Sequence, residues 1–89
     1  MTGMIEFWVE ASNKNGSAER YKKFKLPSLP RRKELFEFDS AWASYARVLG
    51  VYHYADHLHP HHEIEIEVDE MAFDGLTEEK GWFSEKKFP

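Results

Sequence analysis

The histidines of this chain are concentrated in one short stretch, residues 53–62. Histidine is the commonest metal ligand in proteins, and its charge changes most readily near neutral pH. His53 and His57 are four residues apart, so on a helix both rings would face one ion. Together with His59 and His61 they form a candidate site for zinc or another divalent transition metal.

Known catalytic metal motifs do not fit this cluster. The stretch from His57 to His62 approaches the H-x-H-x-D-H ligand motif of metallo-β-lactamase-like hydrolases, but His61 stands where that motif has aspartate. The HExxH motif is also absent, because the residue directly after His53 is not glutamate. The plainer interpretation is a polar corner whose histidines are solvated or bonded to nearby acids. We therefore expect no cofactor, and a metal-binding protein built on the His53–His62 cluster is the alternative.

An acidic segment follows the histidines, over residues 63–69. Carboxylates alternate there with Ile64, Ile66 and Val68, which is the period of a strand with one buried face. The outward row consists of Glu63, Glu65, Glu67 and Asp69. Such a row can imitate the phosphate edge of a nucleic acid and occupy a basic groove on another protein. Alternatively it is structural, and faces Lys23 and Lys25 of a neighbouring strand as cross-strand ion pairs.

The charges divide the chain into a basic and an acidic part. Residues 14–33 contain a single acid, Glu19, among many lysines and arginines, whereas residues 56–79 contain no lysine or arginine. The net charge is −4. Such asymmetry affects partners and association rates rather than the fold.

Two aromatic residues are expected on the same outward face as the basic residues of the N-terminal hairpin. Trp8 and Tyr21 would lie beside Lys23 and Lys25, and aromatics among basic residues are used for stacking by single-strand nucleic-acid binders. The acidic net charge and the missing RNP motif disfavour nucleic acid, so this module is a second alternative. We instead include Trp8 and Tyr21 with the acidic row as candidate partner-binding residues.

Alternation, turn residues and prolines predict the elements that position these residues. We expect a hairpin over residues 4–26, a loop over 27–32, a short strand over 33–38, a helix over about 40–58, a strand over 63–69 and a C-terminal flap over 74–89. The hairpin is indicated by Asn15-Gly16, since this pair adopts the positive φ angles of tight turns.

The helix is indicated by large side chains that recur at three- and four-residue steps. They are Trp42, Tyr45, Ala46, Leu49, Tyr52 and His53. Asp39 or Ser40 is a suitable N-cap, and Pro60 cannot continue the helix. Gly50 either ends the helix as a C-cap or lies within it. The pattern continues past this glycine and favours the longer helix.

These elements predict a single α+β domain over residues 1–89, with a small antiparallel sheet of three to four strands and one long helix packed on it. The aromatic share of 16% is sufficient for a packed core in a chain of 89 residues. Cysteine is absent, which excludes disulfides and zinc–thiolate sites. No apolar run approaches the length of a membrane span and no signal-peptide pattern is present, so we expect a cytoplasmic protein without a membrane partner.

The sequence contains no candidate catalytic set. It has neither cysteine nor a serine in a nucleophile-elbow context, and it lacks a glycine-rich phosphate loop. We expect a non-enzymatic domain that binds another protein or protein complex through a charged and aromatic surface. Small cysteine-free domains of this type are frequent among phage and mobile-element inhibitors of host CRISPR or restriction complexes, which is an argument from type alone. The partner's identity, the oligomeric state and the strand order stay open.

Overall fold

The computed structural model describes residues 3–40 and 45–88. Its elements, in chain order, are β1 (Ile5–Asn13), β2 (Glu19–Leu26), β3 (Leu35–Glu37), β4 (Tyr45–Tyr54), β5 (His61–Val68) and α1 (Glu70–Glu78). The strands form one mixed sheet in the order β2-β1-β5-β4-β3, in which β1 and β5 are parallel and the other neighbours are antiparallel.

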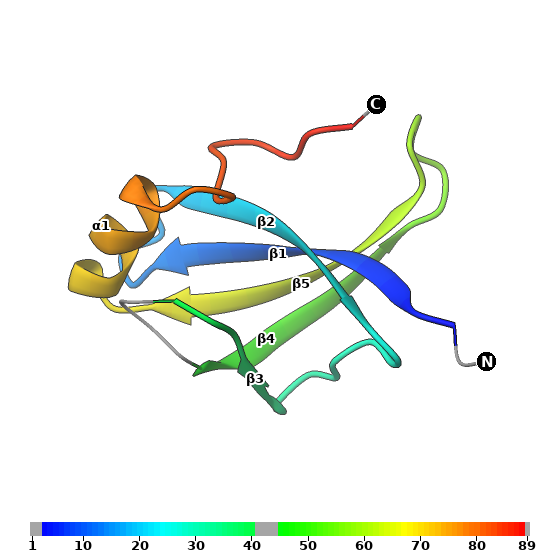
Figure 1. Ribbon diagram of the computed structural model, residues 1–89, viewed down its shortest axis with the longest axis horizontal. Helices are drawn as coiled ribbons and strands as arrows, with labels where there is room; N and C mark the ends of the chain where they lie inside the picture. Colours follow the sequence, from blue (N-terminus) through cyan, green and yellow to red (C-terminus); the bar gives the residue numbers. More distant parts are fainter. Residues whose placement is uncertain (1–2, 41–44, 89) are drawn as a thin grey trace.

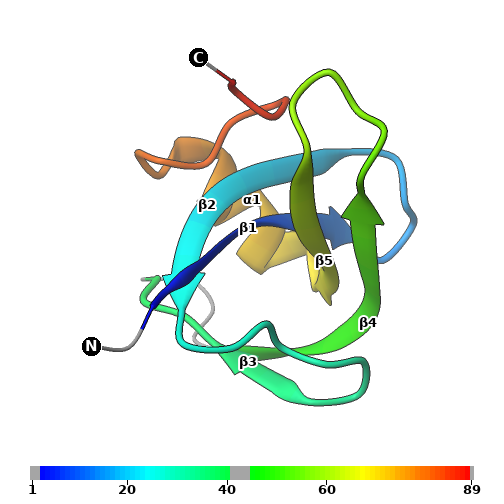
Figure 2. The same cartoon turned by 90° about the vertical axis from the view of Figure 1, so that its right-hand side faces the viewer.

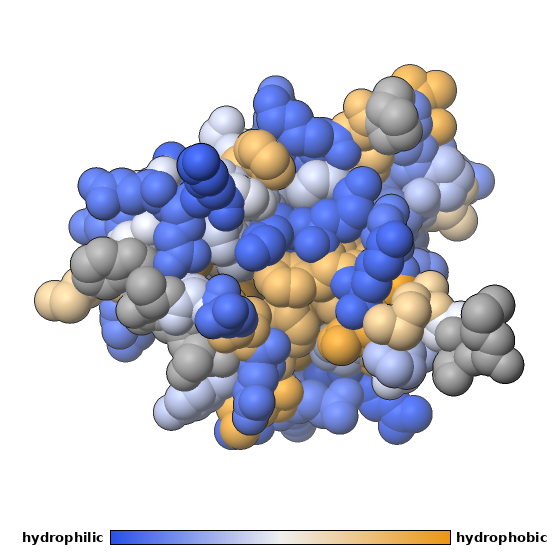
Figure 3. All heavy atoms as spheres, in the orientation of Figure 1, coloured by the Kyte–Doolittle hydropathy of each residue, from blue (hydrophilic) through white to orange (hydrophobic). Residues whose placement is uncertain are grey.

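The sheet is curled into a half-barrel. Figure 2 shows the strands bending around a common interior, with β2 and β3 at the two ends of the curl. In Figure 1 the helix α1 lies at one end of the strands. A strongly twisted sheet encloses its core on the concave side, and that inner face here holds apolar residues from every strand. The space-filling view gathers hydrophobic residues near the middle of the face it shows, with hydrophilic ones around them (Figure 3).

The predicted N-terminal hairpin is present as β1 and β2. Their register runs from Ile5 opposite Leu26 to Ser12 opposite Glu19. The turn between them contains Gly16 at φ +68°, as expected of an Asn-Gly turn. The short strand and the acidic strand predicted over residues 33–38 and 63–69 correspond to β3 and β5.

The predicted helix over about 40–58 is wrong, because Tyr45–Tyr54 forms strand β4. Its inward residues are Ala46 and Val48, and a bulge between Val48 and Gly50 then shifts the register, so that Val51 is the next side chain packed against the core. The helix prediction failed because Tyr45, Leu49 and Tyr52, which it placed on one buried stripe, are exposed on the strand. The bulge also breaks the two-residue period by which a strand is recognised. Residues 41–44, which include the predicted core residue Trp42, lie outside the described part of the chain.

The predicted fold class is therefore also wrong. The protein is a five-stranded mixed sheet with one short helix, and not a small antiparallel sheet under a long helix. The helix lies further along the chain, at α1, where Asp69 accepts a hydrogen bond from Ala72 N at 2.8 Å as an N-cap. Phe73 and Leu76 of α1 are buried against the sheet. The segment predicted as a flap from residue 74 thus begins inside this helix.

A single apolar cluster fills the half-barrel. Its buried members are Phe7, Val9, Ala11, Phe36, Phe38, Ala46, Val48, Ile64, Ile66, Val68, Ala72, Phe73, Leu76 and Trp82. Many of its contacts are between aromatic rings: Phe36 packs edge-to-face on both Phe7 and Phe24. No helix in the described residues is long and apolar enough to cross a membrane.

Residues 79–88, called the C-terminal segment from here on, pass around the edge of the sheet beside β2. Trp82 is buried among the core side chains. The next residue, Phe83, exchanges two backbone hydrogen bonds of 2.8 Å with Tyr21 of β2. Lys86 and Phe88 then contact side chains on the other face of the sheet. One short segment therefore covers both faces.

Candidate functional site

The side chains that point away from the core define what we call the outer face. Because successive residues of a strand alternate between the two faces, the register places them in cross-sheet rows. One row runs through Lys23, Trp8, Glu63 and Tyr52, and the next runs through Tyr21, Glu10, Glu65 and Gly50. The outer face therefore mixes carboxylates with aromatic side chains from four strands.

The predicted ladder between the acidic strand and the basic strand is absent, because β1 lies between them. Lys23 and Lys25 of β2 instead approach one residue of β1, Glu6, whose carboxylate oxygens lie 3.6 Å and 3.8 Å from the two ammonium groups. These groups are substantially exposed, so the pairs contribute little to stability. The carboxylates of β5 therefore form no ion pair with Lys23 or Lys25.

Glu63 is the most deeply buried acid of the outer face, with 3% of its surface exposed. The ammonium of Lys86 in the C-terminal segment lies 2.7 Å from Glu63 Oε1 and 2.9 Å from Nε2 of His61. It also lies 4.3 Å from the ring centre of Tyr54 and 6.0 Å from that of Tyr21. We call Tyr21, Tyr54, His61 and Glu63 the Glu63 cage. Its four walls all attract a cation.

His61 is held in one orientation. Its Nδ1 lies 2.7 Å from the carbonyl oxygen of His59, to which a protonated Nδ1 donates, and its ring stacks on Tyr54 at 4.7 Å between centres. With the proton on Nδ1, Nε2 presents a lone pair to the ammonium of Lys86. Burial lowers the pKa of His61, and the charge of Lys86 lowers it further. His61 is thus a neutral acceptor in the cage at neutral pH.

The remaining carboxylates of the outer face accept hydrogen bonds from tyrosines. Tyr21 donates to Glu10 at 3.0 Å, and Tyr52 donates to Glu65 at 3.1 Å. The pKa of Glu10 is raised, chiefly by burial and also by the like charges of Glu63 and Glu65. Among residues 3–40 and 45–88, no lysine or arginine forms an ion pair with Glu10, Glu65 or Glu67. The face is therefore electrostatically negative and only partly compensated.

Gly50 in β4 makes room for one of these hydrogen bonds. Gly50 lies opposite Glu65. A Cβ atom at Gly50 would lie 2.8 Å from the hydroxyl oxygen of Tyr52. The missing side chain thus allows the Tyr52 ring to lean back along its own strand and reach the carboxylate of Glu65.

The structure separates the six residues predicted for partner binding. Glu63, Glu65 and Glu67 share the outer face, whereas Asp69 caps α1 and leaves the row. Trp8 lies on the outer face but is only 3% exposed, because the ring of Phe88 and the ammonium of Lys23 cover it. Tyr21 is half-buried and bonded to Glu10. Trp8 therefore offers no exposed ring for stacking while Phe88 lies on it.

Four residues of the outer face were missed by sequence reasoning: Glu10, Tyr52, Tyr54 and Lys86. Glu10 alternates with Trp8 in a strand that the sequence predicts, so its position was available. Tyr52 and Tyr54 were assigned to a helix. Nothing in the local sequence places Lys86 against Glu63, since that contact depends on the path of the C-terminal segment.

The histidines of the predicted metal site do not all converge on one point, although the rings of His57 and His61 lie 5.0 Å apart. His53 pairs with His62 across β4 and β5, with 2.8 Å between the two Nδ1 atoms. His57 and His59 lie in the following loop, and the ring of His59 stacks on Phe88 at 5.0 Å. The helical spacing expected of His53 and His57 does not exist, since His53 is in a strand. In the part of the chain that the structure describes, no group of three or more ligating side chains could hold a metal ion.

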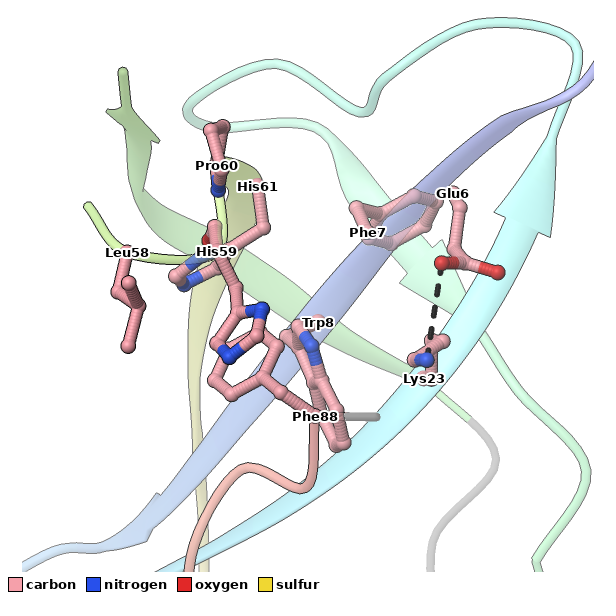
Figure 4. Close-up of a pocket in the computed structure, with 9 residues that line it drawn as sticks. All are labelled: Glu6, Phe7, Trp8, Lys23, Leu58, His59, Pro60, His61 and Phe88. Atoms are coloured by element: carbon pink, nitrogen blue, oxygen red, sulfur yellow. Dashed lines mark hydrogen bonds and ion pairs between the residues drawn. The ribbon is translucent and has the colours of Figure 1, made fainter. Parts of the chain in front are cut away.

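A pocket of about 310 Å³ lies at the end of the outer face near this loop. Figure 4 shows Phe88 between His59 and Trp8, with the ion pair of Glu6 and Lys23 on the far side. The pocket is thus lined by aromatic rings on one side and by a neutralised charge pair on the other.

No protein-family model, no curated protein and no solved structure matches this chain.

Proposed function

We propose that this protein is a non-enzymatic protein-binding domain whose outer face binds a basic surface of another protein. The observation that carries this proposal is the group formed by Glu10, Glu65 and Glu67 on two neighbouring strands. None of the three forms an ion pair with a described lysine or arginine. A cationic partner would supply the missing counter-charges.

The geometry of the sheet concentrates this negative charge. Neighbouring strands are about 4.8 Å apart and alternate residues of one strand about 6.7 Å apart, so Glu10 and Glu65 lie side by side. The raised pKa of Glu10 reflects this crowding in addition to burial. Complementary charge steers a partner to such a face and fixes its orientation. We therefore expect the affinity to fall as ionic strength rises.

On β4, exposed apolar groups border the acidic residues. Tyr52 is 43% exposed and Leu49 is 45% exposed. The hydroxyl of Tyr52 is fixed by Glu65, so its ring is held in one position before any partner arrives. Tyrosines of this kind are enriched among residues that dominate binding energy at protein interfaces. The outer face thus offers both charge complementarity and a rigid aromatic contact.

The narrower form of this proposal is an inhibitor of a host complex of the CRISPR or restriction type. Such complexes hold nucleic acid in positively charged channels, and a face of carboxylates has the matching charge. The spacing is a thin copy of a duplex, which carries a charge about every 1.7 Å along its axis. The sign of the charge on the outer face therefore supports an inhibitor of this type, and the density of that charge does not.

The proposal is tested by capture from the lysate of a plausible host. The test variant changes Glu10, Glu65 and Glu67 to glutamine, and the control variant changes Glu70→Gln, Asp74→Asn and Glu78→Gln on α1, which removes the same net charge elsewhere. We expect a partner that the wild type and the control retain and the test variant loses. Recovery of the same partners by all three would contradict the proposal. Capture should also weaken when NaCl is raised from about 0.1 M to about 1 M.

A further inference from the structure

We infer that the Glu63 cage is a binding site for a lysine side chain of the partner protein, and that the chain's own Lys86 fills it until the partner arrives. The inference rests on the proposed function and names the group that the outer face recognises. In the structure the C-terminal segment supplies the ammonium, so the site is seen with a ligand from the same chain.

The cage is built to hold a positive charge. Burying a carboxylate is costly unless a cation and hydrogen bonds compensate for the lost water, and Glu63 is only 3% exposed. Apart from the ammonium of Lys86, no described donor reaches Glu63 Oε1. The cage therefore requires a cation for as long as Glu63 stays buried and ionised.

The other walls select the kind of cation. The ring of Tyr54 lies within the range of about 6 Å over which a ring face attracts a cation. His61 Nε2 offers a lone pair at 2.9 Å, which an ammonium N–H can use and a quaternary ammonium cannot. The ammonium of Lys86 hydrogen-bonds to His61 and forms an ion pair with Glu63 at the same time. Trimethylation would remove the N–H donors.

Lys86 is held in the cage by side chains alone. The last backbone hydrogen bonds between the C-terminal segment and the sheet are those of Phe83 with Tyr21. Beyond Phe83, as far as the structure describes the chain, the contacts are those of Lys86 in the cage, Lys87 on Phe83, and Phe88 with Trp8 and the loop histidines. Residues 84–88 can therefore lift about Phe83 without breaking the sheet. Local opening of this kind needs far less free energy than unfolding.

The position of the cage favours exchange with a partner. Glu10 and Glu65 lie in the row next to Glu63, and their charges act on one another. A basic surface attracted by these half-buried carboxylates would bring its lysines beside the cage. A tethered ligand such as Lys86 competes at a high effective concentration. A free lysine should therefore bind weakly to the wild type and more tightly once Lys86 is removed.

The test uses the full chain with Lys86→Ala and n-butylammonium, which has the four-carbon stem and head group of lysine. We expect saturable NMR shifts at the ring signals of Tyr54 and His61, with an apparent affinity at least tenfold higher than in the wild type. Lys87→Ala is the matched control, since it loses the same charge outside the cage and should bind like the wild type. Equal weak shifts in all three proteins, or none in Lys86→Ala, would overturn the inference.

Two further arms keep the test decisive. If Lys86→Ala is unfolded by itself, n-butylammonium and not NaCl should restore its native spectrum, and failure to do so would overturn the inference. The peptide acetyl-Gly-Lys-Gly-amide should bind Lys86→Ala in the same way as n-butylammonium. Binding of the amine without binding of this peptide would show a site for small amines only and would overturn the assignment to a partner's lysine.

The outcome is distinguishable from a failure of the proposed function. The host-capture experiment depends on Glu10, Glu65 and Glu67, none of which belongs to the Glu63 cage. If the variant of these three acids loses capture but Lys86→Ala does not bind the amine, the inference about the cage alone is refuted. If Lys86→Ala binds the amine but the variant of the three acids still captures the partner, the proposed recognition by the acidic residues is refuted.

Discussion

The two faces of the curled sheet use the same strands for different purposes. On the inner face, phenylalanines and β-branched residues from every strand pack with α1 and Trp82 in one closed cluster. On the outer face, carboxylates are compensated by tyrosine hydroxyls, by Lys23 and Lys25 of β2 and by Lys86 of the C-terminal segment. Apolar burial is the dominant favourable term in folding, whereas crowded like charges oppose it. The inner face therefore sustains the fold, and the outer face is where we propose that a partner binds.

The largest expected effect belongs to the inner face. Phe7 is fully buried and contacts two other phenylalanines. We expect Phe7→Ala to lower the free energy of unfolding by about 3–5 kcal/mol, because it removes a ring and leaves a cavity. Glu67→Ala on the outer face should change it by no more than about 0.5 kcal/mol. Urea denaturation measures both values, and similar losses in the two variants would refute the division between the faces.

The second effect concerns Glu63, the buried acid of the outer face in residues 3–40 and 45–88. Lys86→Ala leaves the carboxylate of Glu63 without its ammonium. We expect a loss of about 2–3 kcal/mol, below the 3–5 kcal/mol typical of a broken buried pair, because the segment can lift and admit water. Lys87→Ala, measured by the same urea titration, should be nearly neutral. Equal losses in both lysine variants would show that the cage does not contribute to stability.

A third effect marks where the outer face ends. Asp69 continues the alternation of Glu63, Glu65 and Glu67 in sequence, but in the structure it caps α1. We expect Asp69→Ala to cost about 1 kcal/mol of unfolding free energy through the lost cap. Thermal or urea unfolding of Asp69→Ala beside Glu67→Ala checks this. A neutral Asp69→Ala would return this residue to the acidic row.

The smallest effect is a dependence of stability on pH. Burial lowers the pKa of His61 in the folded protein, while the unfolded chain titrates near about 6.5. At pH values between the pKa of His61 in the folded protein and that in the unfolded chain, the unfolded state binds more protons than the folded state. The stability is therefore fully present above about pH 6.5 and falls as the pH decreases. His61→Gln should weaken this fall. Urea midpoints at about pH 7.5 and 5.5 measure it, and equal pH dependence in the wild type and His61→Gln would contradict the assignment.

Strict local patterns predicted the part of the fold that the structure confirms. The Asn15-Gly16 turn and the alternation in β1 gave the hairpin, and the alternation of Ile64, Ile66 and Val68 gave β5. In β4 the bulge at Gly50 disturbs the two-residue period, and the three- and four-residue steps of Tyr45, Leu49 and Tyr52, which are exposed on the strand, resemble a helix. Strand order could not follow from any of these patterns, since it depends on the parallel pairing of β1 with β5 across the crossover.

The candidate site was predictable only where it follows from alternation. The outward direction of Glu63, Glu65 and Glu67 needs no more than the period of β5. Their partners were assigned wrongly, because the basic strand was expected beside β5 and β1 lies there instead. The burial of Trp8 and the pairing of Lys86 with Glu63 both arise from the C-terminal segment. No local pattern specifies the path of that segment.

The measurement that tests the central claim most directly is amide chemical-shift mapping with a tetralysine peptide at low salt. A binding outer face predicts saturable shifts concentrated on β1, β5 and the part of β4 around Tyr52, and their loss when Glu10, Glu65 and Glu67 are changed to glutamine. Binding of the same peptide should be unchanged in the control variant, in which three acids on α1 are replaced. Shifts concentrated on α1, or spread over all acidic residues alike, would contradict recognition by the outer face.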